Sequence, residues 1–332
     1  MRSSLNSILP APEPVLNLQG RVIPVSEPLL NGNEIKYLTD CIKTGWISSL
    51  GGYVERFERG FGRFCRAKYA VSVSSGTAAL HLALASLGIG KGDEVILPAF
   101  TMVSTPNAVM YQGAKPVLVD SEDKAFGIDP AKIEEKITKR TKAIIVVHIY
   151  GHPARMDEIL KIARKHKLYV IEDAAEAHGA EYKGKRVGSI GDVGCFSFYG
   201  NKIIATGEGG MLVTSNRKIK DKAEYLRDLA FSKERHFWHK ELGFNYRMSN
   251  LQAAVGLAQL ERIRYLINIK RKNALLYKKF LSDIPGIILP PEEKYAKNVF
   301  WMYAVLVNKD FGITRDELRV KLARKGIDTR IF

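Results

Sequence analysis

Cysteine is scarce in this chain, which holds three cysteines among 332 residues. Cys41, Cys65 and Cys195 show no paired spacing and no CxxC motif, so we expect neither a disulfide framework nor a thiolate zinc site. A reducing compartment, the cytoplasm, is the simplest interpretation. No window approaches 18 uninterrupted apolar residues, and the N-terminus lacks the apolar stretch and cleavage site of a secretory signal. We therefore predict no membrane segment.

Acidic residues are outnumbered, because 51 Lys and Arg stand against 35 Asp and Glu, a formal net charge of +16. The 46% hydrophobic and 26% charged content excludes global disorder and low-complexity repetition. A charge of this size fits three partner classes: nucleic acid, an anionic membrane surface, or phosphorylated small molecules. Composition does not choose among them.

The length predicts two domains. Residues 1–21, rich in proline and without periodicity, are expected to form a flexible extension. Residues 22–262 are expected to form a large domain and residues 263–332 a smaller α+β domain that looks incomplete. We interpret residues 250–268 as one long helix because their apolar side chains recur near 3.6 spacing.

The large domain alternates short apolar runs with amphipathic stretches from Ala70 onward. This pattern predicts βαβ units, that is, an α/β fold with a mostly parallel sheet and helices on both faces. A helix is expected to open at Asp129-Pro130, and another at about Arg217. In the small domain we expect a strand over 303–307 and a helix over 315–324.

Two short patterns imitate functional motifs. Gly88, Gly90 and Gly92 resemble a dinucleotide fingerprint, but they follow a predicted helix and precede a strand, so we interpret them as a helix cap and turn. Two histidine pairs, His148/His152 and His236/His239, lack a third converging ligand, and we expect no metal.

Three features of the large domain carry candidate ligand-binding chemistry. Residues 74–77 (SSGT) close a strand and open a helix, which makes either an anion site or an ordinary N-cap. Glu172 and Asp173 end an apolar strand, at the sheet edge where ligands bind or where an acid only caps the next element. Lys202 lies between an aromatic run and a glycine-rich turn, so a desolvated, nucleophilic amine is weighed against an ordinary surface lysine. An anchor for the phosphate, a partner for the pyridinium nitrogen and a partner for the aldehyde are the parts that a pyridoxal phosphate site requires, so the three features together indicate such a site.

Four ordered blocks carry a resemblance to a known family: VSVSSGTAALHLAL, VIEDAAEAHGA, CFSFYGNKIIATGEGGM and GFNYRMSNLQAAVGLAQLE. Together they resemble the DegT/DnrJ/EryC1/StrS sugar-nucleotide aminotransferases, over about Val22 to the end. The resemblance implies the aspartate aminotransferase-like fold, type I of the pyridoxal-phosphate-dependent transferases.

The resemblance assigns the cofactor contacts by position. Lys202 would attach covalently to pyridoxal 5'-phosphate, and Asp173 would pair with its pyridinium nitrogen. Glu176 would contact the phenolic oxygen. Met102 stands where many relatives carry an aromatic side chain that stacks on the ring, so a thioether would fill that space.

The phosphate contacts follow from the same resemblance. Ser197, Gly76 and Thr77 would cradle the cofactor phosphate. Asn245 would reach the phosphate of the neighbouring subunit, which implies a homodimer with shared active sites.

Within the family, GWISS around Trp46, FWH at 237–239 and GFNYRM look most like the GDP-perosamine synthases. This subfamily aminates GDP-4-keto-6-deoxymannose at C4. Trp46, His239 and Arg247 are candidate substrate residues, and each could equally serve packing, a loop hydrogen bond or a dimer salt bridge.

The implied reaction is ping-pong transamination from L-glutamate, with pyridoxamine phosphate as the intermediate form of the cofactor. Lys202 would move the proton as general base and acid. The alternatives are a UDP- or dTDP-4-keto sugar acceptor, a sugar dehydratase, in which histidine occupies the lysine position, and a cofactor-binding protein without turnover. A nucleic-acid binder has only the +16 charge in its favour.

Overall fold

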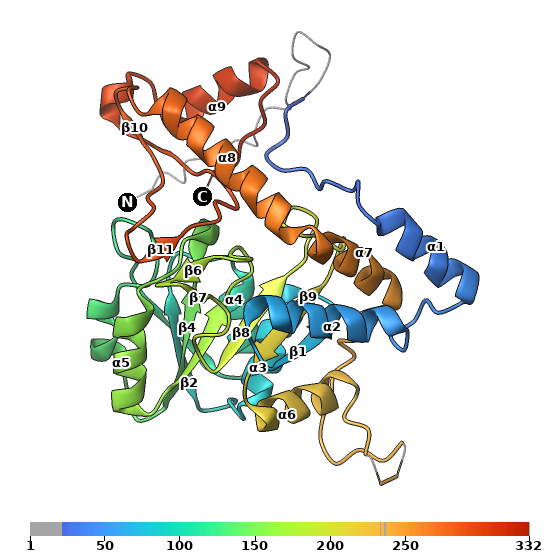
Figure 1. Cartoon of the computed structure of the whole chain (residues 1–332). Coiled ribbons are helices and arrows are strands. Elements are labelled where there is room, and N and C mark those ends of the chain that lie inside the picture. Colours follow the sequence, from blue (N-terminus) through green and yellow to red (C-terminus); the bar gives the residue numbers. More distant parts are fainter. Residues whose placement is uncertain (1–21, 233, 236, 332) are drawn as a thin grey trace, which may run out of the picture. The chain divides into compact units, whose positions relative to one another are not determined.

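The computed structural model describes residues 22–232, 234–235 and 237–331 (Figure 1). The predicted extension 1–21 lies outside the described residues. The described chain divides into two compact units. The core unit comprises residues 28–274 and 291–303, and the terminal unit comprises 22–27, 275–290 and 304–331. The predicted boundary at residue 262 stays a prediction.

A seven-stranded sheet with the order β1-β9-β8-β5-β4-β2-β3 organises the described core unit. The neighbours β3, β2, β4, β5 and β8 run parallel, whereas β9 is antiparallel to both β8 and β1. The predicted mostly parallel sheet is therefore confirmed. The strands are β1 (Tyr69–Val73), β2 (Glu94–Pro98), β3 (Lys115–Val119), β4 (Thr141–Val147), β5 (Tyr169–Asp173), β8 (Val193–Ser197) and β9 (Gly210–Thr214).

Helices cover both faces of this sheet, because alternate strand residues point to opposite sides. Val71, Leu97 and Ile171 pack in one cluster with residues of α3 (Gly76–Ser86), α4 (Ser104–Tyr111) and α6 (Arg217–Arg227). Their strand neighbours pack on the other face. Ile144 and Val170 contact α5 (Met156–His166), and Phe196 joins residues of α2 (Gly52–Cys65) and α7 (Asn250–Glu261).

The remaining elements of the core unit are short or peripheral. α1 (Glu34–Thr44) packs on α7. A small three-stranded sheet joins β6 (Glu181–Tyr182), β7 (Lys185–Arg186) and β11 (Ala296–Lys297). All three cysteines are buried and free. Gly88 and Gly92, with φ of 72° and 95°, lie in the turn between α3 and β2, in agreement with the predicted cap and turn.

The terminal unit contains β10 (Ile287–Ile288), which pairs antiparallel with β12 (Leu306–Val307), and α9 (Arg315–Arg324). Thr314 caps α9, and the Glu317 side chain bonds back to it in a capping box. Ile23 pairs with Ile327 through backbone hydrogen bonds. The predicted helix over 315–324 is confirmed, whereas the predicted strand over 303–307 shortens to β12.

Two predicted helices differ in the structure. The helix over 250–268 is two helices, α7 and α8 (Ile263–Leu281), because Arg262 leaves the helical conformation and its N–H bonds to the Gln259 carbonyl. The helix expected at Pro130 is a pair of 3₁₀ turns, Pro130–Lys132 and Glu134–Lys136, and it goes no further because the backbone is already extended at Ile137.

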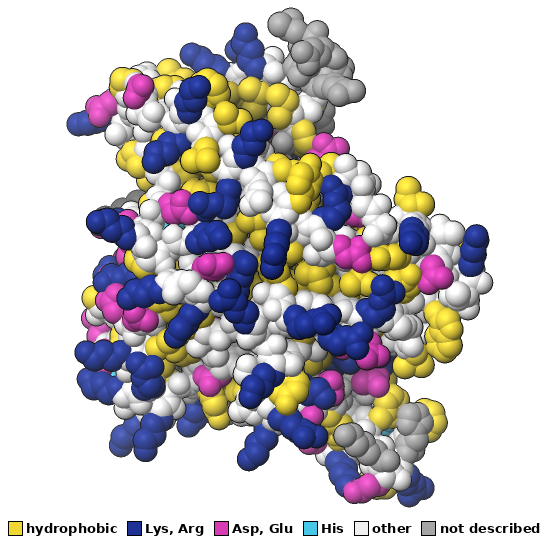
Figure 2. Space-filling view, viewed as in Figure 1, with side chains coloured by type: hydrophobic (Ala, Val, Ile, Leu, Met, Phe, Trp, Pro, Cys, Tyr) yellow, Lys and Arg dark blue, Asp and Glu magenta, His cyan; other side chains and the backbone are white. Residues whose placement is uncertain are grey.

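Charge and hydropathy of the surface agree with the composition. Figure 2 shows Lys and Arg side chains spread over the viewed face, with Asp and Glu side chains between them. Among the described residues, no helix combines the length and the apolar composition that a membrane span requires.

Candidate active site

The carboxyl ends of β1, β5 and β8 meet at one edge of the sheet, because these three strands run in the same direction. Asp173 is the last residue of β5, Ser197 is the last residue of β8, and Gly76 opens α3 directly after β1. The structure thus brings the predicted phosphate anchor and the predicted pyridinium partner to the same edge, where open α/β sheets bind ligands.

Asp173 is a buried carboxyl group with two hydrogen bonds from the chain. The Thr105 hydroxyl donates to Oδ2 at 2.8 Å, and the Ala175 N–H donates to Oδ1 at 3.2 Å. Burial raises the pKa of Asp173, while these two donors and the nearby Lys202 oppose the rise. No Lys, Arg or His of the described residues forms an ion pair with it. A carboxylate held in this way is suited to a cationic N–H partner.

Glu172, its neighbour, points to the other face of the sheet. Its two oxygens accept hydrogen bonds from the backbone N–H groups of Gly188, Ile190 and Gly191 and from His148 Nε2. His148 Nδ1 accepts from the Ala154 N–H, so Nε2 carries the proton of a neutral ring. The sequence left two roles open for these acids, ligand binding and structural capping. The hydrogen bonds assign structural capping to Glu172.

Lys202 lies in the turn after β8, five residues beyond Ser197, with its side chain 11% exposed. Its Nζ lies 3.8 Å from Glu176 Oε1 and 3.8 Å from the centroid of the Trp301 ring. Burial lowers the pKa of Lys202, and the carboxylates of Glu176 and Asp173 oppose that change. The amine is therefore partly desolvated, as its predicted nucleophilic role requires.

Glu176 follows β5 and faces the lysine. Its Oε2 accepts the backbone N–H of Tyr150 at 2.7 Å. Burial raises the pKa of Glu176 to about 7. A carboxyl group with that pKa exists in both protonation states near neutral pH, so it can donate a hydrogen bond as well as accept one.

The start of α3 fits the predicted anion cradle. Ser75 caps the helix by accepting the Ala78 N–H at 3.1 Å, which leaves the first backbone N–H groups, those of Gly76 and Thr77, at the open end. A Cβ placed on Gly76 would lie 2.7 Å from Ser197 Cβ. Glycine is therefore required for the close approach of the helix start to the end of β8, and Ser197 shares this corner with the free N–H groups.

Other predicted residues lie farther from the lysine. Met102 is 66% exposed just before α4, and Asn245 is exposed on the segment that pairs with Asp228. The Arg247 guanidinium binds Asp228. His239 Nδ1 lies 2.8 Å from the Leu229 carbonyl, and Trp46 is exposed. Within the described residues, no recorded contact joins these side chains to Lys202 or Asp173.

The histidine pairs do not converge on a metal site within the described part of the chain. His148 binds Glu172, and His152 Nδ1 lies 2.9 Å from the Pro153 carbonyl. His236 lies outside the described residues.

Three residues of the site were not found from the sequence. Thr105 binds Asp173, Tyr150 binds Glu176 through its backbone, and Trp301 covers the lysine amine. Thr105 lies in the FTMVST segment already singled out for Met102, so its place beside a candidate ring contact was the available signal. Trp301 had none, since it is far from the motifs along the chain.

The residues fit pyridoxal phosphate. The lysine amine is desolvated, a buried carboxyl group lacks a cationic partner in the described chain, and a helix start faces a serine across a glycine. Fold and site together define the chain as a fold type I enzyme that depends on pyridoxal phosphate, as predicted.

Comparison with known proteins leads to the same class of enzyme. The chain belongs to the DegT/DnrJ/EryC1/StrS aminotransferase family, whose model matches residues 28–332. It is 46% identical over 309 residues to GDP-perosamine synthase of Caulobacter vibrioides, covering 93% of this chain and 83% of that protein. The predicted family and the predicted class of aminotransferase are thereby confirmed.

Solved structures lead to the same fold and cofactor. The structure of DesI in the presence of its TDP-sugar product matches with a TM-score of 0.86 at 29% identity, over 93% of this chain and 79% of that one. NtdA from Bacillus subtilis with bound cofactor PMP matches with a TM-score of 0.76 at 33% identity, over 83% and 63%. The predicted fold type I and the predicted cofactor are confirmed.

Proposed function

We propose that the chain transfers the amino group of L-glutamate to the C4 keto carbon of a nucleotide-linked 4-keto-6-deoxyhexose, with GDP-4-keto-6-deoxymannose as the favoured acceptor and GDP-perosamine as the product. The observation that carries the chemistry is the desolvated Lys202 amine held between Glu176 and Trp301 at the sheet edge. The choice of acceptor is supported by the 46% identity to a GDP-perosamine synthase.

The residues of the site divide the work. When bound, pyridoxal phosphate supplies an electron sink for the carbon that bears the transferred nitrogen. Lys202 would hold the cofactor covalently at rest, and its released amine would move the proton as base and then as acid. Asp173 would favour the protonated ring nitrogen through charge pairing, and Glu176 would share a hydrogen bond with the phenolic oxygen.

The remaining contacts position the cofactor. The N–H groups at the start of α3, with Ser197 and Thr77, would bind the phosphate through hydrogen bonds and the helix dipole. Met102 would pack against the ring. Over the whole reaction, glutamate leaves as 2-oxoglutarate and the keto sugar leaves as the amino sugar, so the amino group and the keto oxygen exchange places.

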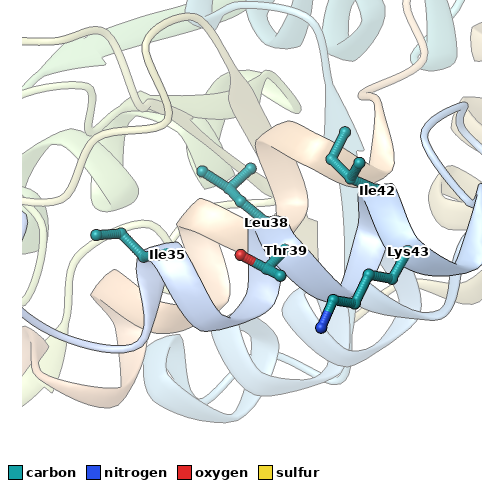
Figure 3. A pocket seen from close by; sticks show the side chains of 5 residues that line it. All are labelled: Ile35, Leu38, Thr39, Ile42 and Lys43. Atoms are coloured by element: carbon teal, nitrogen blue, oxygen red, sulfur yellow. The ribbon is translucent and has the colours of Figure 1, made fainter.

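A second copy of the chain completes the site in this proposal. Large apolar side chains stand exposed on two helices: Ile35 and Ile42 of α1 are 78% and 65% exposed, and Met110 and Tyr111 of α4 are 60% and 63% exposed. Figure 3 shows Ile35, Leu38 and Ile42 along α1 beside a pocket whose described lining residues all belong to this helix. Exposed apolar faces of this kind favour burial against another protein surface. Asn245, exposed and without a recorded contact to its own chain's lysine, would then serve the partner's phosphate.

We place the reaction in the cytoplasm. The three free, buried cysteines are consistent with a reducing compartment.

The acceptor is tested by incubating the full chain with glutamate and GDP-, UDP- and dTDP-4-keto-6-deoxy sugars, and by identifying products by mass. We expect the GDP-linked substrate to be converted to an amino sugar faster than the UDP- and dTDP-linked substrates. A deoxygenated product would indicate a dehydratase, and a cofactor that glutamate converts without any aminated sugar would indicate a binding protein without turnover.

Shared sites are tested by mixing two inactive variants, Lys202→Ala and Asn245→Ala, after reversible dissociation. If each site takes Lys202 and Asn245 from different subunits, half of the dimers are mixed and each has one intact site, so about a quarter of the activity returns. No recovery, with mixed dimers demonstrated by mass, would contradict the shared site.

A further inference from the structure

The Lys202 amine lies over the face of an aromatic ring supplied by a distant part of the chain. Its Nζ is 3.8 Å from the centroid of the Trp301 indole, well inside the range of about 6 Å in which a cation is attracted to the ring face. Trp301 is 8% exposed. Because both groups are withdrawn from water, the attraction between ammonium and ring is stronger than at a surface.

Trp301 is held in place by the same segment that carries the lysine. Its Nε1–H donates to the carbonyl of Asn201, the residue before Lys202, at 2.8 Å. Its backbone N–H donates to the Tyr150 carbonyl at 3.1 Å, and the Tyr150 ring stacks on the indole at 16° with centroids 6.3 Å apart. The edge of the indole thus fixes the lysine backbone while its face covers the lysine amine.

The contacts return to the lysine through Glu176. Tyr150, whose φ is +53°, donates its backbone N–H to Glu176 Oε2 at 2.7 Å, and Oε1 of the same carboxyl lies 3.8 Å from Lys202 Nζ. The amine is therefore enclosed by a ring face and a carboxyl group. Two further titratable groups interact electrostatically with the amine. Asp173 favours the charged amine, and the lysine charge lowers the pKa of His178.

We propose that Trp301 is a positioning residue for Lys202, whose indole face binds the amine when it is released from covalent attachment and carries a proton, and keeps it beside Glu176. A lysine stem has four rotatable bonds, so a released amine would otherwise sample many positions. The inference rests on the proposed role of Lys202 as proton carrier. The further point is that Trp301 holds the Lys202 amine in one position while it carries the proton.

The contact itself is tested without turnover. The chain has three tryptophans, so Trp46→Phe with Trp238→Phe leaves Trp301 as the sole tryptophan, which is excited at a wavelength that tyrosine does not absorb. The full-length chain, freed of cofactor, is titrated with base while Trp301 fluorescence is recorded. We expect a transition as the ammonium over the ring loses its proton, and we expect Lys202→Met to abolish it. Lys270→Met is the matched control, because the Lys270 amine binds the Trp301 carbonyl rather than the ring face, and the transition should persist.

The consequence for the lysine is tested with Trp301→Leu and Trp301→Phe. In the cofactor-free chain, the pH dependence of the rate at which added pyridoxal phosphate attaches reports the Lys202 amine. Trp301→Leu should move its midpoint down by about one pH unit, while Trp301→Phe, which keeps a ring face, should move it less. In the loaded enzyme, Trp301→Leu should lower kcat about tenfold with KM nearly unchanged.

Each outcome decides the proposal. A transition that survives Lys202→Met, or a Trp301→Leu variant that loses stability but keeps the midpoint of the parent, would show that Trp301 only packs and would overturn the inference. A normal transition and midpoint shift in a chain that aminates no sugar would leave the positioning contact standing and would defeat the proposed function instead.

Discussion

Two acids that are adjacent in the sequence, at the end of β5, differ in how far hydrogen bonds from the chain satisfy them. Glu172 accepts four hydrogen bonds, three from backbone N–H groups and one from His148, so the chain itself satisfies both oxygens. Asp173, on the other face, receives two, and the nearby Glu176 and Lys202 are held by one short hydrogen bond and one 3.8 Å ion pair. Buried polar groups that the fold leaves incompletely satisfied mark where a ligand belongs.

The largest effect on amino transfer is expected from removing the amine of Lys202, which lies near Asp173 and Glu176. Lys202→Ala removes both the covalent attachment point and the proton carrier, so amino transfer should fall by about 10³-fold or more, and the absorbance of lysine-bound cofactor should vanish. The control is Lys270→Met, a second lysine whose pKa burial lowers, which should keep that absorbance. Full turnover by Lys202→Ala would show that the active site does not lie at this edge of the sheet.

The comparison between the two acids is tested directly by a matched pair of amides. Asp173→Asn should leave the folded chain stable but lower turnover about 100-fold or more, because the ring nitrogen loses its anionic partner. Glu172→Gln should instead destabilise the chain by about 2–4 kcal/mol, since an amide N–H₂ then faces backbone donors. Denaturant unfolding and turnover are measured on both. If the two variants changed the same quantity, the division of labour argued above would fail.

How far the sequence leads can be judged from these same residues. Lys202 and Asp173 could be predicted from the sequence because each lies near the end of a strand, and the carboxyl ends of parallel strands share an edge, whereas Ser197 was predicted only from the family resemblance. Thr105 and Trp301 were not found, because their contacts depend on how α4 and residues 291–303 pack against that edge. Local pattern also failed at Arg262, where the periodicity continues but the helix does not.

The phosphate end of the site allows a smaller and cleaner test. Gly76→Ala places a Cβ 2.7 Å from Ser197 Cβ, so the start of α3 must move away from β8, and we expect the Kd for pyridoxal phosphate to rise about tenfold. Gly52→Ala is the matched control, because Gly52 is also the first residue of a helix and its added Cβ meets no atom within 4 Å. Equilibrium titration of the cofactor-free chain measures both. Equal Kd values for the two variants would separate Gly76 from the anion cradle.

The smallest effect concerns His178, a fully buried ring beside the site that packs among Phe61, Phe196 and Phe198. Burial lowers the pKa of His178 to about 3, below its ordinary value of 6.5. Above pH 6.5 the ring is neutral in the folded and the unfolded chain, so it adds no pH dependence. As the pH falls toward 3, the unfolded chain takes up a proton that the folded chain refuses, and stability is lost. His178→Phe removes this proton uptake, so between pH 7.5 and pH 5 the free energy of unfolding of the variant should drop by about 2 kcal/mol less than that of the parent. Because burial is the largest cause of the shift and the Lys202 charge adds to it, the difference should persist in the cofactor-free chain, and denaturant unfolding at the two pH values measures it. Identical losses in both proteins would mean that the folded chain admits the proton.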